Sequence, residues 1–127
     1  VCTTFRVTEH WQTGALSRQT PWLVETQPQV FLEISPQLAK ELKVKNGDKL
    51  TVESARGSIW AVAMVTERMA PLAVMGRRLH QVGLSWQFGW FAPKNGGDAA
   101  NLLSPSVGDA NASIPETKSF MVNVRKA

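Results

Sequence analysis

The sequence has little of the chemistry that builds metal centres or cross-links small folds. Its one cysteine, Cys2, excludes an internal disulfide and any metal cluster held by cysteines. Its two histidines, His10 and His80, lie far apart in the chain, which disfavours a zinc site. No apolar run approaches the roughly 20 residues that a membrane-spanning helix needs. We therefore expect no metal site in this chain and no direct membrane insertion.

The sequence also lacks repeats, low-complexity tracts and a strong concentration of one charge. Its 14 Lys and Arg residues outnumber its 10 Asp and Glu residues, for a net charge of +4. The cations cluster only at Lys40–Lys49 and Arg77–Arg78, so an extended nucleic-acid stripe is not indicated, and an anionic small ligand suits the balance better. The length of 127 residues and the 43% apolar content fit one globular domain, residues 1–127.

The chain opens on an apolar, β-branched segment without a methionine or a signal-like stretch. We interpret it as a piece of a longer protein, from which targeting information has been left behind.

What is present is a succession of short strand patterns and few helices. Strands are predicted at 2–8, 30–34, 50–54, 59–65, 72–75, 79–84 and 120–124. Ser35 and Pro36 predict the start of a helix over 37–42, and Asp98 a short helix over 99–103. Irregular connections are expected at 22–27 and 104–118. The strand at 59–65 is nearly all apolar, which predicts a core on both of its faces.

This pattern indicates a mainly β protein with short helices. Six or seven short strands with one good helix favour a closed or nearly closed β-barrel.

The first strand runs into a loop that is unusually rich in hydrogen-bond donors. Gly14 lies among hydroxyl side chains, where backbone N–H groups can approach an anion. Arg6 and Arg18 can supply planar, bidentate charge to a phosphate. A solvated loop with one buried aromatic residue is the simpler alternative for these residues alone.

Three separated blocks of sequence carry a resemblance to a known family. They are Thr3-Thr4-Phe5-Arg6 with Glu9-His10-Trp11, Thr13-Gly14 and Ser17-Arg18; Phe31-Leu32-Glu33-Ile34-Ser35-Pro36 with Gly47-Asp48 and Arg56-Gly57-Ser58; and Asn101-Leu102-Leu103-Ser104-Pro105 with Pro115-Glu116-Thr117-Lys118. Together they resemble the molybdopterin-dinucleotide-binding domain, the C-terminal domain of molybdenum and tungsten oxidoreductases of the dimethyl-sulfoxide-reductase superfamily. Gly76-Arg77-Arg78, Val82-Gly83-Leu84 and the tail at 107–123 are similar to the large (alpha) subunit of formate dehydrogenases.

The resemblance implies a double-psi β-barrel and a cofactor, bis-(molybdopterin guanine dinucleotide) with molybdenum or tungsten. It implies a parent enzyme that oxidises formate to CO2, with the metal ligand, catalytic residues and an iron–sulfur cluster in other domains of the large subunit. It also implies an iron–sulfur small subunit as partner, and the subgroup suggests a periplasmic location. This chain alone is expected to bind cofactor and not to catalyse.

The cofactor-binding residues that the resemblance implies come from three parts of the chain. They are Thr4, Arg6, His10, Thr13, Gly14, Leu16, Ser17, Trp86, Gln87, Asn101 and Lys118. Asn101 suits the edge of a guanine or pterin, and Lys118 adds a point charge for phosphate. Gln87 and Thr117 depart from the family pattern, which has His and Tyr at these positions.

Each of these residues also has a structural interpretation. Arg6 could pair with Glu9 at the surface, and Asn101 could belong to a capped helix. His10, Trp86 and Gln87 could belong to an aromatic core.

Two other hypotheses from different classes compete with cofactor binding. Trp86, Phe88 and Trp90 with Arg77 and Arg78 could bind single-stranded nucleic acid by stacking. A protein-adaptor barrel without a ligand is the other. Asp109, Asn111 and Ser113 imitate the start of a calcium loop, but the required glycine and closing glutamate are missing.

Overall fold

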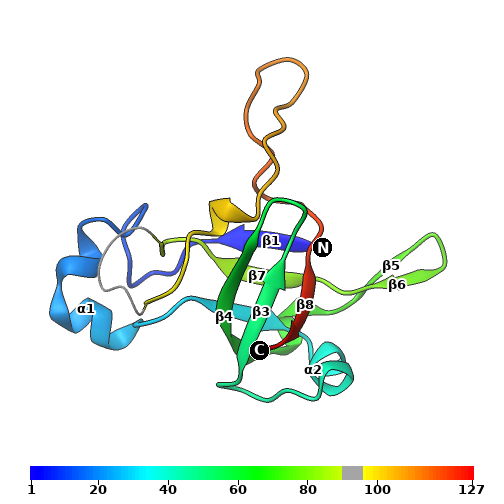
Figure 1. Cartoon of the computed structure of the whole chain (residues 1–127), viewed down its shortest axis with the longest axis horizontal. Helices are drawn as coiled ribbons and strands as arrows, with labels where there is room; N and C mark the ends of the chain where they lie inside the picture. Colours follow the sequence, from blue (N-terminus) through cyan, green and yellow to red (C-terminus); the bar gives the residue numbers. More distant parts are fainter. Residues whose placement is uncertain (90–95) are drawn as a thin grey trace.

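In the computed structural model, residues 1–89 and 96–127 are described, and these form a mainly β fold with short helices. The elements in chain order are β1 (Cys2–Phe5), η1 (Ser17–Gln19), α1 (Pro21–Thr26), β2 (Phe31–Ile34), α2 (Pro36–Leu42), β3 (Lys49–Glu53), β4 (Ser58–Val65), η2 (Glu67–Met69), β5 (Leu72–Val74), β6 (Arg77–Leu79), β7 (Val82–Ser85), η4 (Ala100–Leu102) and β8 (Asn123–Lys126). Figure 1 shows how they are arranged. Trp90 lies outside the described residues, as does the first half of a turn that the sequence Lys94-Asn95-Gly96-Gly97 predicts.

Six strands form one sheet in the order β1-β7-β2-β4-β3-β8. The pairs β1–β7 and β2–β4 are parallel, while β2–β7, β3–β4 and β3–β8 are antiparallel. The sheet is open in this pairing, so the prediction of a mainly β fold is confirmed and closure into a barrel is not. The edge strand β1 nevertheless contacts the segment that leads into the other edge strand, β8: Cys2 and Phe120 exchange backbone hydrogen bonds of 2.8 and 3.2 Å.

The core lies on one face of the sheet, where alternate residues of the strands point. Fully buried side chains include Leu32, Ile34, Leu50, Val52 and Leu84. Along β4, Ile59, Ala61 and Ala63 are buried, whereas Met64 on the opposite face is 43% exposed. The prediction of a core on both faces of this strand is therefore wrong, because the described residues cover only one of them.

The helix α2 follows from the sequence signals that predicted it. The Ser35 hydroxyl accepts a hydrogen bond of 3.1 Å from the Leu38 N–H, and Pro36 occupies the first helical position. Lys43 ends the helix in the left-handed conformation, with φ of +55°. The helix α1 was not predicted, since Pro21 and Pro28 were interpreted as brackets of an irregular connection. Pro21 instead stands in the first turn of α1.

Two segments project from the six-stranded sheet (Figure 1). One is the hairpin of β5 and β6, which form a two-stranded sheet of their own at the right of the figure. The other is the long connection at 104–118, drawn at the top, which is held across its base by a bridge between Gly108 and Pro115. The candidate functional site lies away from the tips of both segments.

Candidate functional site

The parallel strands β1 and β7 end side by side, and the residues that follow them begin the site. Phe5 lies opposite Ser85, and the Trp86 N–H donates a 3.2 Å hydrogen bond to the Phe5 carbonyl oxygen. Arg6 comes directly after β1, and its guanidinium carbon lies 5.4 Å from the centre of the Trp86 ring. In sheets with parallel strands, the carboxyl ends of the strands are where ligands commonly bind. A cation stacked on an aromatic face is thus presented at this edge.

The end of the chain brings a second cation to the same place. The Lys118 ammonium donates a 2.8 Å hydrogen bond to the Thr4 carbonyl oxygen, and the Thr4 hydroxyl donates to the Thr117 carbonyl oxygen at 2.9 Å. Lys118 is exposed, and an ammonium has three donors, so one carbonyl leaves donors for a ligand. Asn101, in η4, is also exposed.

These residues enclose a cleft of about 690 Å³. It is lined by Thr4, Phe5, Arg6, Trp86, Asn101, Thr117 and Lys118. Two of the lining residues are cations and none is a carboxylate, so the lining favours an anion. The amide of Asn101 both donates and accepts, which suits the edge of a heterocycle.

A second cleft, of about 640 Å³, has different chemistry. Its lining includes Phe31, Val62 and Met64 on the outer face of the sheet. The charged residues in it are Glu33 and Arg68, whose side chains form a 3.1 Å ion pair. Because this pair is neutralised internally, the cleft offers no net charge to an anion. We therefore place the candidate site in the first cleft.

The loop after β1 is held from inside by Gln87, which is fully buried. Its Oε1 accepts the Val7 N–H at 2.7 Å, and its Nε2 donates to the carbonyl oxygens of Val7 and His10. All of its polar atoms are therefore used by backbone groups of the loop. Within the described residues, Gln87 shapes the loop rather than lining the cleft.

His10 and Ser17 are also buried inside this loop. The His10 Nε2 lies 2.8 Å from the Gln27 carbonyl oxygen; a carbonyl only accepts, so this nitrogen carries the proton. The ring meets Phe88 edge-on, with centroids 5.7 Å apart. The Ser17 hydroxyl oxygen accepts the Trp11 N–H at 2.9 Å, which closes the loop upon itself.

Arg18, which the sequence offered as a phosphate ligand, is turned into the interior. Its guanidinium donates to the carbonyl oxygens of Gln87 and Gly89 at 3.4 and 3.5 Å, and lies 5.1 Å from the Phe88 ring centre. Burial lowers the pKa of this guanidinium from its ordinary value. Arg18 therefore braces the loop against the segment that follows β7.

The structure thus divides the predicted site residues into three groups. Thr4, Arg6, Trp86, Asn101 and Lys118 meet at the cleft. Gly14, His10, Ser17 and Gln87 are buried in the loop and its support, while Thr13 and Leu16 are exposed on the loop. The alternative pairing of Arg6 with Glu9 is not formed in the described part of the chain. Contact of any of these residues with a cofactor stays a prediction.

Two residues at the cleft were not among the predicted ligands. Phe5 and Thr117 line it; both lie in the blocks that carry the family resemblance, but neither was assigned to the cofactor. Thr117 is placed by its carbonyl bond to Thr4, 113 positions away. No local sequence signal could have indicated that contact.

The stacking surface of the nucleic-acid hypothesis is not assembled in the described residues. Phe88 is only 3% exposed and packs in the core, so its face is not available to a base. Arg77 and Arg78 lie on β6, in the hairpin that precedes β7, whereas Trp86 follows β7.

Within residues 1–89 and 96–127, no group of three His, Cys, Asp or Glu side chains could hold a metal ion. Nor does any helix of that part have the length and apolar character needed to cross a membrane.

Comparison with known proteins converges on one family. The family model for the molydopterin dinucleotide binding domain, that is, a molybdopterin-binding domain, matches residues 1–121. The chain is 59% identical over its whole length to the formate dehydrogenase subunit alpha of Megalodesulfovibrio gigas, and 44% identical to the nitrate-inducible formate dehydrogenase major subunit of Escherichia coli. It spans 12% of the length of each of these relatives.

A solved structure agrees on the fold. Acetylene hydratase from Pelobacter acetylenicus superposes on 99% of the chain with a TM-score of 0.72, although only 13% of residues are identical and 18% of that protein is covered. At this identity the similarity concerns the fold alone.

Proposed function

The chain belongs to the family of molybdopterin dinucleotide-binding domains, and from this premise we propose that its positively charged cleft holds the dinucleotide end of the cofactor. The observation that carries the proposal is the meeting of Arg6, Asn101 and Lys118 in one cleft without a carboxylate. A dinucleotide joins phosphates to a flat base, and the cleft offers cations, an amide and an aromatic face. The donor set therefore fits the group.

We propose guanine as the base and bis-(molybdopterin guanine dinucleotide), with molybdenum or tungsten, as the cofactor. Arg6 and Lys118 would hold phosphate oxygens, with Asn101 at the edge of a ring. When bound, the metal supplies the two-electron chemistry of formate oxidation to CO2. The role of this chain is to bind and orient the remote end of the cofactor, and thereby to position its reactive end.

The wider assembly is part of the same proposal. The relatives are formate dehydrogenase alpha and major subunits of which this chain spans 12%, which supports a place within a large subunit that carries the metal ligand and iron–sulfur domains. An iron–sulfur small subunit would be its partner, and the periplasm its compartment. The parallel pairs β1–β7 and β2–β4 and the bridge between Cys2 and Phe120 support closure as a double-psi barrel.

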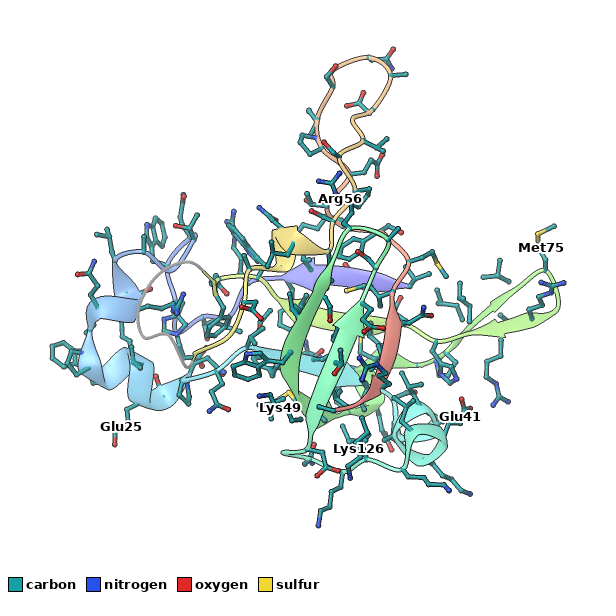
Figure 2. All side chains as sticks on the ribbon, in the orientation of Figure 1. Glu25, Glu41, Lys49, Arg56, Met75 and Lys126 are labelled. Carbon is teal, nitrogen blue, oxygen red and sulfur yellow. The ribbon has the colours of Figure 1, made fainter. Side chains whose placement is uncertain are left out.

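The test is cofactor loading of the full-length enzyme. Removing Arg6 or Asn101 deletes a proposed polar contact with the dinucleotide, and such contacts contribute about 1–3 kcal/mol, or about 5- to 150-fold in affinity. We expect Arg6→Ala and Asn101→Ala to lower the guanine and metal content per polypeptide after gel filtration. Arg56→Ala, an exposed arginine on the turn between β3 and β4, is the matched control (Figure 2). Full loading of both cleft variants would contradict the proposal.

A further inference from the structure

Arg6 lies at the cleft in a place where a long side chain is hard to hold still. It is exposed, and it comes directly after Phe5, where the pairing of β1 with β7 ends (Figure 1). A long side chain loses much rotamer freedom when it grips a ligand, and backbone beyond the end of a strand pair can fray. A contact that holds Arg6 in one position beforehand therefore strengthens binding without touching the ligand.

Trp86 and Gln87, the two residues that follow β7, hold the backbone on both sides of Arg6. On one side, the Trp86 N–H donates a 3.2 Å hydrogen bond to the Phe5 carbonyl oxygen. On the other side, the Gln87 side chain accepts the Val7 N–H at 2.7 Å and donates to the Val7 carbonyl oxygen at 3.0 Å. The Gln87 amide thus bonds to both polar groups of Val7, as the backbone of a neighbouring strand would. It extends the pairing of β1 past the point where the two strands end.

The charged end of Arg6 is held by the same two-residue segment. The guanidinium carbon lies 5.4 Å from the centre of the Trp86 ring, within the range of a cation–π contact. Trp86 is partly buried and packs against the hydrophobic core, so its ring offers the guanidinium a fixed surface. Arg6 is therefore supported at its backbone through Gln87 and at its charged group through Trp86.

The hydrogen bonds of Gln87 require an amide in one orientation. The Val7 N–H only donates, so the atom facing it is Oε1; the carbonyl oxygens of Val7 and His10 only accept, so they face Nε2. Because Gln87 is fully buried, water cannot readily replace a bond that is lost. An apolar side chain of the same size would leave these backbone groups without their partner. The segment that follows Arg6 should then lose its fixed position.

We propose that Trp86 and Gln87 are positioning residues for Arg6. Gln87 fixes the backbone from which Arg6 projects, Trp86 seats its guanidinium, and neither side chain needs to contact the cofactor. This inference rests on the proposed function, in which Arg6 holds phosphate oxygens of the dinucleotide. It gives a different role to two residues that the family resemblance implies are ligands, and it requires their effect on cofactor retention to pass through Arg6.

A double-mutant cycle in the full-length enzyme tests the proposal. The measured quantity is the rate at which guanine nucleotide leaves the loaded enzyme during dialysis. Gln87→Met keeps the volume of the side chain but removes its hydrogen bonds, and Trp86→Leu removes the aromatic face; each should speed release by about fivefold or more. In an Arg6→Ala background, either substitution should change the rate by less than about twofold, because the residue that they position is gone.

Two further variants separate positioning from a general loss of structure. Trp86→Phe keeps an aromatic face for the guanidinium, so it should restore much of the retention that Trp86→Leu loses. Gln81→Met is the matched control: Gln81 lies before β7, at the end away from the cleft, and its side chain donates to the Met69 sulfur at 3.7 Å. Its release rate should stay within about twofold of the wild type. Should Gln87→Met fail to fold, the cycle of Trp86 and Arg6 decides.

The outcome of the cycle distinguishes failure of this inference from failure of the proposed function. If Gln87→Met or Trp86→Leu speeds release in the Arg6→Ala background as much as in the wild type, the effect does not pass through Arg6 and the proposal is overturned. Wild-type release from both single variants would overturn it as well. In both cases rapid release from Arg6→Ala alone would leave the proposed function standing. Wild-type release from Arg6→Ala would instead end the phosphate role of Arg6, and this inference with it.

Discussion

Gly14 and Gly47 have nearly the same backbone conformation, with φ of +81° and +87°, but opposite surroundings. A Cβ added at Gly14 would lie 2.5 Å from the Gln87 carbonyl oxygen and 2.8 Å from the Arg18 Cδ, whereas one at Gly47 would meet nothing within 4 Å. The two glycines therefore separate the cost of a positive φ from the cost of a close contact.

We expect Gly47→Ala to lower the free energy of unfolding by about 1 kcal/mol, the cost of the left-handed conformation alone. Gly14→Ala should lower it by more, about 2–4 kcal/mol, because the backbone at Gln87 cannot move away freely. Urea unfolding followed by tryptophan fluorescence measures both. Equal effects of the two substitutions would show that the loop yields at Gly14.

For individual residues, the sequence predicted the members of the cleft better than it predicted the roles of residues in the loop after β1. Arg6 and Lys118 were assigned by motif and do line the cleft. Gln87 and Arg18 carry the same polar groups as ligands would, yet they bond to main-chain carbonyl oxygens of distant segments. Such bonds depend on where the backbone runs, and no side-chain pattern encodes that.

Among the elements, the projecting segment at 104–118 is ordered by one carboxylate. Asp109 accepts hydrogen bonds from the backbone N–H groups of Asn111, Ala112 and Ile114, at 2.9–3.0 Å. These bonds, that of Ala112 first, hold the pKa of Asp109 below its ordinary value. The resemblance of Asp109, Asn111 and Ser113 to the start of a calcium loop is therefore explained by a carboxylate that caps the backbone of its own turn.

The order of this segment should depend on pH. Because the folded-state pKa is lowered, the stabilising effect of the carboxylate is complete above the ordinary aspartate pKa of about 3.9 and is lost as the pH falls through the lower folded value. Protection of the Asn111, Ala112 and Ile114 amides from hydrogen exchange, measured relative to an unstructured peptide at the same pH, should fall on acidification in that window. In Asp109→Ala these amides should lack that protection at every pH. Protection that persists unchanged in Asp109→Ala would contradict this account.

Element boundaries show what the sequence can and cannot specify. Ser35 and Pro36 encode the start of α2 locally, so that helix was predicted. The helix α1 was not, because Pro21 begins a helix in the same way that it begins an irregular turn. For β4 the apolar run predicted the strand correctly but not which of its faces is buried. The face that carries Met64 is exposed because no other described element packs against it.

For the molecule as a whole, Cys2 reports whether the sheet is intact. It is fully buried in β1, between β7 and the bridge to Phe120, and burial raises the pKa of its thiol to about 12. Because the folded-state pKa is raised, the contribution of the neutral thiol to stability is complete below the ordinary thiol pKa near 9.0 and is lost as the pH rises toward 12.

We therefore expect Cys2 to react with a disulfide reagent at neutral pH about a thousandfold or more slowly than an exposed thiol, through opening of the fold. A control is Met75→Cys in a Cys2→Ala background, since position 75 is 97% exposed. Reaction rates measured across a urea series should follow the unfolding transition. A rate equal to that of the control in the absence of urea would mean that the edges of the sheet part readily.

The contact between Lys118 and the Thr4 carbonyl joins positions that lie 114 residues apart in the sequence. During synthesis, the amino-terminal wall of the cleft leaves the ribosome long before the lysine that completes it has been translated. A nascent polypeptide that ends before Lys118 therefore has the residues of β1 that line the cleft but lacks this lysine. Under the proposed function, retention of the cofactor therefore requires synthesis through Lys118, and a chain truncated before this residue should retain less dinucleotide.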